Sequence, residues 1–97
     1  MKKVLGLTAA LILSASAQAF DVEAKYNQAC AACHAVGVAN APKAFDPAAW
    51  APRLATGMDT LVASVNQGKG AMPPKGLCMD CSTDQFKALI KYMSKAK

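Results

Sequence analysis

The segment C-A-A-C-H at residues 30–34 constrains this chain more than any other feature. In a helical turn, residues three apart lie on the same side, so the thiols of Cys30 and Cys33 can bond one edge of the same planar group. His34, the only histidine in the chain, then follows under the centre of that group. C-x-x-C-H is the attachment sequence of c-type haem, so the motif predicts one covalent haem with His34 as its proximal iron ligand.

Two other interpretations use the same cysteines. A redox-active C-x-x-C of the thioredoxin kind belongs to a βαβ unit, and the apolar spacing of this chain does not predict one. A zinc site could combine Cys30 and Cys33 with Cys78 and Cys81. The two pairs are separated by 44 residues, whereas roughly 15 to 20 are usual for such zinc sites. Haem is therefore the preferred interpretation.

The second axial ligand of the iron has to be a methionine, because the chain has no second histidine. Met93 belongs to the apolar stripe of a predicted helix, Met58 lies at a helix boundary, and Met79 lies between two cysteines. Met72 lies in the loop G-A-M-P-P at residues 70–74, which two prolines stiffen and a glycine keeps free of bulk. This context predicts Met72 as the ligand, although packing is the more common role of a methionine.

Residues 1–19 have the features of a secretory signal peptide. Lys2 and Lys3 form a positive start, residues 4–13 are apolar but too few to span a bilayer comfortably, and A-Q-A at 17–19 is a cleavage site. We expect cleavage after Ala19, a mature domain at residues 20–97, and a periplasmic location in which cysteines can be oxidised. An uncleaved membrane anchor is the alternative.

The predicted mature domain has few side chains with which to build a core. Of its 78 residues, 40 are hydrophobic, but 16 of these are alanine and four are cysteine. A domain of this size is marginally stable even with a good core, so we expect a cofactor to fill its centre. Its net charge of +3 is too small to indicate binding to nucleic acid.

The spacing of apolar residues predicts an all-α chain of about four short helices. The expected helical segments are residues 21–32, 46–57, 59–68 and 82–95. Asp21 and Asp46 are predicted N-caps of the first two helices, Asp59 or Thr60 is predicted to cap the third, and Pro52 conflicts with the second. The last helix is the clearest, because S-T-D-Q at residues 82–85 fits a capping box.

Taken together, the chain resembles the small class I cytochromes c, and most closely the cytochrome c5 group. The resemblance covers the mature domain and is carried by A-C-A-A-C-H at residues 29–34, G-V-A-N-A-P-K at 37–43, G-A-M-P-P-K-G at 70–76 and C-M-D-C at 78–81. It implies the class I cytochrome c fold, with about four short helices wrapped around one covalently attached haem.

The resemblance also implies roles for three residues around the haem. The backbone carbonyl of Pro42 is expected to accept a hydrogen bond from His34, which orients the ring and makes it a stronger donor. Arg53 and Trp50 match positions near the haem propionates, where the guanidinium can offset a carboxylate charge and the indole N–H can donate to one. For Trp50, a purely structural role in the core remains the alternative.

Cys78 and Cys81 form a second C-x-x-C that Ser82, rather than a histidine, follows. A second haem is therefore not predicted. In an oxidising compartment a local disulfide is the expected state of this pair, and two free thiols are the alternative.

The resemblance implies a contact between the first and last helices, in which Tyr26 packs near Tyr92. Many relatives have a glycine one turn before this tyrosine, and this chain has Val22 there. The distance between the two helices is therefore left open.

A histidine at one axial position and a methionine at the other leave no open site on the iron, so we expect a periplasmic one-electron carrier and not an enzyme. A haem peroxidase or gas sensor with a displaceable methionine is the alternative. The expected partners are periplasmic or membrane-bound redox proteins, a reductase and an oxidase or terminal reductase, in transient complexes. We expect neither a nucleic acid partner nor a small-molecule substrate. We expect contact with a membrane only through membrane-bound partners. Lys43, Lys69 and Lys75 are candidate charges at the rim of the docking surface.

Overall fold

The computed structural model describes residues 20–97, in which three other α-helices pack against α5 (Thr83–Ser94). The other elements are α1 (Val22–Lys25), η2 (Tyr26–Cys30), α2 (Ala31–His34), η3 (Val38–Asn40), α3 (Pro47–Leu54), α4 (Met58–Gln67) and η4 (Pro74–Leu77). Apart from one antiparallel bridge between Lys69 and Met72, this part of the chain contains no β-structure. The predicted all-α class is confirmed. The predicted signal peptide lies outside the described residues.

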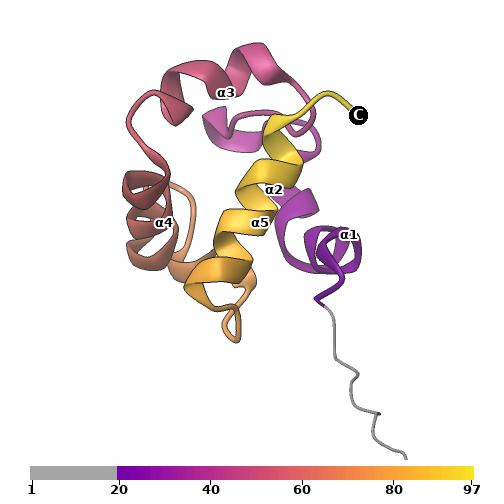
Figure 1. Ribbon diagram of the computed structural model, residues 1–97, viewed down its shortest axis with the longest axis vertical. Coiled ribbons are helices and arrows are strands. Elements are labelled where there is room, and N and C mark those ends of the chain that lie inside the picture. The colour runs from indigo at the N-terminus through magenta and orange to yellow at the C-terminus, as the bar shows by residue number, and fades with distance from the viewer. Residues whose placement is uncertain (1–19) are drawn as a thin grey trace, which may run out of the picture.

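The apolar face of α5 forms the centre of the core. Figure 1 shows this helix crossing the middle of the molecule, with α4 on one side and α1 and α2 on the other. Phe86, Leu89, Ile90 and Met93 recur at helical spacing, and each is at most 4% exposed. The predicted capping box is present, because the Ser82 hydroxyl accepts from the Gln85 N–H and the Gln85 side chain accepts from the Ser82 N–H. Within residues 20–97, no helix has the length and apolar character needed to cross a membrane.

The first helix is longer than predicted and is interrupted by a π-helical turn. It runs through residues 22–34 as α1, η2 and α2, and the predicted cap is present as Asp21, which accepts from the Ala24 N–H at 3.0 Å. A π turn adds a residue to the turn, so it rotates the following residues about the helix axis relative to a regular α-helix. It therefore sets the direction in which residues 30–34 face.

The second and third helices depart from the predictions at single residues. Pro52 lies inside α3 without ending it, because a proline at this position removes only one hydrogen bond from a short helix that Asp46 caps. The predicted cap of α4 is wrong. This helix begins at Met58 with Gly57 as its N-cap, and Asp59 lies in its first turn, 3.8 Å from the ammonium of Lys87 in α5.

Three aromatic rings join the first helix to α5. Tyr26 and Tyr92 lie 5.4 Å apart between ring centroids, as the resemblance implies, and Phe45 lies 5.5 and 5.2 Å from them. Val22 is half-buried and packs against this part of the core, so the contact accommodates a valine. The two contacts of Phe45 are edge-on, an arrangement that stabilises a core beyond the area that it buries.

We predict that Ser82→Ala lowers the free energy of unfolding by about 1 kcal/mol, because the Gln85 N–H loses its acceptor at the start of α5. Denaturant titration of the haem-loaded protein measures the change. Ser82→Asp is the matched control, since a carboxylate can accept the same bond and should keep most of the stability. Equal stability of the alanine variant and the wild type would contradict this role of the cap.

Candidate haem site

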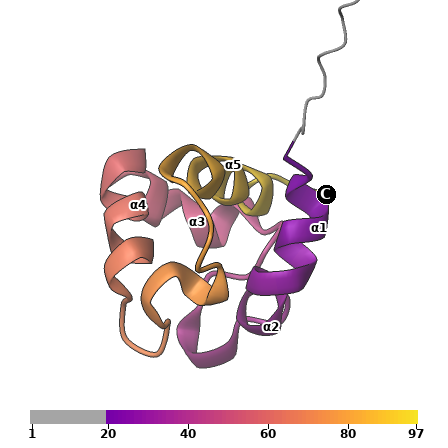
Figure 2. The same ribbon diagram turned by 90° about the horizontal axis from the view of Figure 1, so that it is seen from below.

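A pocket of about 410 Å³ lies against α5 and is mainly apolar. Its lining includes six of the seven residues predicted for haem binding: Cys30, Cys33, His34, Pro42, Arg53 and Met72. Figure 2 shows the orange turn that contains η4 on the same side of the molecule as α2, and η2 and η4 are in contact. The fold thus brings the C-A-A-C-H segment and the loop at residues 70–74 that contains Met72, here called the methionine loop, to one pocket.

His34 is held in one orientation at this pocket. Its ring is buried, its Nδ1 lies 2.8 Å from the carbonyl oxygen of Pro42, and it stacks on Trp50 at a centroid distance of 5.6 Å. A carbonyl can only accept, so Nδ1 carries the proton and donates it to this bond. The other nitrogen, Nε2, therefore keeps its lone pair for a metal, and the hydrogen bond makes it a stronger donor. The structure contains the contact that the resemblance implies for Pro42.

Cys30 and Cys33 are half-buried free thiols that line the same pocket. Burial raises the pKa of the Cys30 thiol to about 11. A redox-active C-x-x-C instead needs a thiol whose pKa is lowered toward neutrality. The environment of Cys30 therefore argues against the thioredoxin-like interpretation.

The other cysteine pair is engaged elsewhere. Cys78 and Cys81 are joined as a disulfide, with their Cα atoms 5.5 Å apart, and both are almost fully buried. Among the described residues, the one cluster with metal-ligand character consists of these cysteines and Asp80. Because both sulfurs are bonded to each other, they cannot complete a four-cysteine zinc site with Cys30 and Cys33. The structure therefore offers no support for the zinc interpretation.

The structure separates the four candidate methionines into two groups. Met72 and Met93 line the pocket, whereas Met58 does not and Met79 is 70% exposed at the disulfide. Met93 is a buried core residue of α5, as its place in the apolar stripe predicts. The backbone of Met72 is fixed by two hydrogen bonds with Lys69, of 2.9 and 3.0 Å.

Arg53 and Trp50 have different surroundings, although the resemblance assigns both to the haem propionates. Arg53 lines the pocket, and its guanidinium donates to the carbonyls of Ala49 and Asn40 at 3.1 and 3.3 Å. Trp50 does not line the pocket, and its indole N–H donates to the Lys43 carbonyl at 3.0 Å. This differs from the prediction. The structure favours the alternative, in which Trp50 is a core residue that supports His34.

Two of the three predicted rim lysines lie at the pocket. Lys69 is exposed there, but Lys75 is half-buried, with its ammonium 3.4 Å from Asn66 Oδ1 and 5.5 Å from the centroid of the Phe86 ring. Lys43 does not line the pocket. The lining of the pocket also includes exposed apolar side chains that no sequence motif indicates, namely Val38 at 47% and Leu77 at 60% exposed.

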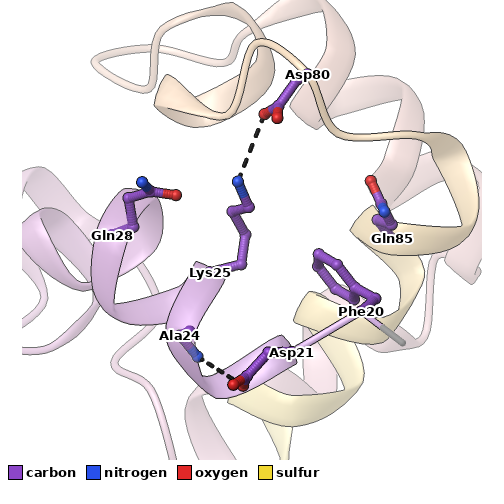
Figure 3. Close-up of a pocket in the computed structure, with 7 residues that line it drawn as sticks. All are labelled: Phe20, Asp21, Ala24, Lys25, Gln28, Asp80 and Gln85. Atoms are coloured by element: carbon purple, nitrogen blue, oxygen red, sulfur yellow. Dashed lines mark hydrogen bonds and ion pairs between the residues drawn. The ribbon is translucent and has the colours of Figure 1, made fainter. Parts of the chain in front are cut away.

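A second, open hollow of about 580 Å³ lies between α1 and the start of α5 (Figure 3). There Lys25 points toward Asp80, and their charged groups are 3.5 Å apart. No thiol, imidazole or thioether lines this hollow. It therefore lacks the groups that hold a c-type haem, and its ion pair links the first helix to the disulfide loop.

The donor groups at the first pocket fit a c-type haem. They comprise two free thiols three residues apart, an imidazole with one nitrogen available, and a thioether on a separate loop. The mainly apolar lining suits a flat aromatic ring, and the Arg53 guanidinium suits its carboxylates.

Comparisons with known proteins agree with this site. Residues 17–93 match the family model described as cytochrome C oxidase, cbb3-type, subunit III. Cytochrome c5 of Azotobacter vinelandii is 53% identical over 76 residues, which cover 76% of this chain and 88% of the relative.

Two solved structures are similar over most of their length. A mono-haem ferrocytochrome c from Shewanella putrefaciens is 56% identical with a TM-score of 0.71, covering 84% of this chain and all of that one. A chain in the crystal structure of an electron transfer complex of nitrite reductase with cytochrome c is 49% identical with a TM-score of 0.68, covering 79% and 95%. With this site and these relatives, the chain belongs to the family of small class I cytochromes c, which carry one covalent c-type haem.

Proposed function

We propose that this cytochrome is a one-electron carrier whose haem is bonded to Cys30 and Cys33 and ligated by His34 and Met72. The observation that carries the proposal is that one pocket brings together both thiols, an imidazole with a free Nε2, and a thioether from a loop far along the chain. Of the two methionines at the pocket, Met93 is accounted for by its packing in α5, which leaves Met72 as the ligand.

When bound, the haem supplies an iron that accepts or releases one electron. The protein's part is to keep the ligands of this iron unchanged during that step. Pro42 holds the imidazole of His34 through the 2.8 Å hydrogen bond. The Lys69–Met72 bonds hold the methionine loop, and a thioether ligand in an apolar pocket favours the ferrous state. Arg53 can offset propionate charge at the mouth of the pocket.

A non-enzymatic role follows from this ligation. A peroxidase or gas sensor needs an iron position that a small molecule can occupy, and Met72 would have to leave to provide one. Two features hold the backbone of Met72 in place and so keep its thioether near the iron: the two hydrogen bonds between Lys69 and Met72, and the nearby disulfide.

Export to the periplasm is part of the proposal, with cleavage after Ala19 and a mature domain at residues 20–97. The character of residues 1–19 supports it, as does the Cys78–Cys81 disulfide, since disulfides persist in oxidising compartments.

The proposed partners are redox proteins that dock transiently at the edge of the haem pocket. Val38 and Leu77 present exposed apolar surface there, and Lys69 adds a positive charge. Such a small, mixed surface suits short-lived complexes, in which local charge steers the encounter. The relative in complex with nitrite reductase provides a precedent for a terminal reductase as the partner.

We predict one covalent haem in protein that matures in a host able to attach it. The denatured protein should retain haem stain on a gel and show the added mass of one haem. Cys30→Ala/Cys33→Ala should lose both signals, whereas Cys78→Ser/Cys81→Ser should keep them. An unmodified mass of the wild type from such a host would disprove the attachment.

We predict that Met72→Ala removes the sulfur-to-iron charge-transfer band of the ferric protein and lowers the reduction potential, because the soft ligand of ferrous iron is lost. Met93→Leu is the control at the same pocket. It should keep the band and change mainly the stability, typically by less than about 1.5 kcal/mol for a swap of similar volume. A band that survives Met72→Ala but disappears in Met93→Leu would reverse the assignment.

We predict that Cys78→Ser/Cys81→Ser leaves the haem attached but makes the Met72 ligand easier to displace by imidazole. The disulfide connects the segment that follows η4 to the start of α5, and closing so short a loop stabilises by roughly 2 kcal/mol in the chain-entropy model. Visible spectra during an imidazole titration measure the effect. Thiol counting on the unfolded, unreduced wild type provides the check, and two reactive thiols there would mean that the disulfide is absent.

A further inference from the structure

The turn that follows the methionine loop has three consecutive residues in the left-handed region. Their φ angles are +63° for Lys75, +53° for Gly76 and +68° for Leu77. This conformation costs a residue with a side chain roughly 1 to 2 kcal/mol, and glycine is free of that cost. Because Lys75 and Leu77 tolerate it with full side chains, the backbone conformation alone does not require a glycine between them. A second constraint acts on residue 76.

That constraint is the side chain of Met72. A Cβ atom built on Gly76 would lie 2.7 Å from the terminal methyl carbon, Cε, of Met72, and it would meet no other atom within 4 Å. Carbon atoms in favourable contact lie about 3.5 to 4.0 Å apart. The space that a side chain at residue 76 would fill is therefore the space that the Met72 methyl group occupies.

The backbones on both sides of this contact are fixed. The Gly76 N–H donates to the Pro73 carbonyl at 2.9 Å, and the next turn is closed by the Cys78 N–H, which donates to the Lys75 carbonyl at 2.8 Å. On the other side, Met72 exchanges two backbone hydrogen bonds with Lys69. An added methyl group at residue 76 could therefore be accommodated only if the Met72 side chain rotated.

Such a rotation has different consequences for folding and for ligation. A free thioether is flexible and can turn aside at little cost, so the fold would survive. A thioether bonded to iron cannot turn without lengthening or breaking that bond. We propose that Gly76 is a positioning residue for the iron ligand, because its missing side chain leaves the room in which the methyl group of Met72 lies. The inference rests on the proposed ligation by Met72.

Gly76→Ala tests the inference, and Gly57→Ala is its control. Gly57 also has a positive φ, of +101°, but a Cβ there would meet nothing within 4 Å, and the residue does not line the haem pocket. Both variants thus carry a backbone penalty, and only Gly76→Ala carries the contact with Met72. We expect Gly76→Ala to weaken the ferric charge-transfer band, lower the reduction potential and bind imidazole about tenfold more tightly than Gly57→Ala, which corresponds to about 1.4 kcal/mol.

The Met72→Ala background separates the possible failures. There the methyl group is absent, so adding Gly76→Ala should leave the imidazole affinity of the Met72→Ala protein unchanged. If Gly76→Ala alone fails to accumulate, the double variant with Met72→Ala should restore it. A double variant that still fails, or a single variant that matches Gly57→Ala in band and imidazole affinity, overturns the inference. If Met72→Ala itself keeps the band, the proposed ligation is wrong.

Discussion

The apolar face of α5 has to be covered from two directions at once, and the rest of the structure depends on this requirement. Phe86, Leu89, Ile90 and Met93 are buried in the core and also line the haem pocket. Helices α1, α3 and α4 pack on this helix, but a domain with so few large apolar side chains cannot cover it completely. A haem in the pocket adds the missing apolar contact, and burial of its apolar ring stabilises the folded state.

Backbone strain in residues 20–97 is concentrated around that pocket. Four of the five non-glycine residues with positive φ line it, namely Ala39 and Asn40 in one loop and Lys75 and Leu77 in the other. Strained conformations persist where the surrounding structure holds them in place, and they gather at functional sites. Here backbone hydrogen bonds hold the second loop, from the Gly76 N–H to the Pro73 carbonyl and from the Cys78 N–H to the Lys75 carbonyl. The resulting rigidity suits a carrier that must keep the same ligands in both oxidation states.

Structural features that depend only on residues within one helical turn were predictable from the sequence. The cap of the first helix at Asp21 and the capping box at Ser82 depend on side chains within three residues of the bonds that they accept. The start of α4 was not predictable in this way, because its N-cap, Gly57, has no side chain that could accept a hydrogen bond, whereas Asp59 lies in the first turn. The spacing of apolar residues also did not predict the π turn between α1 and α2, since one extra residue in a turn leaves no clear pattern in the sequence.

The sequence by itself determined the chemistry of this protein. The C-x-x-C-H spacing identifies a covalent haem, because bonding to a planar group depends on local geometry. The single histidine and the methionine of the G-A-M-P-P loop predict its two ligands. Only the tertiary structure decided which partner each side chain near the haem pocket contacts. In it, the Trp50 N–H donates to a backbone carbonyl, the Lys75 ammonium lies over the Phe86 ring, and Gly76 lies beside the methyl group of Met72. These contacts join residues that are near one another in the chain but separated by irregular turns, so the packing of the whole domain, and not helical periodicity, sets the distances between them.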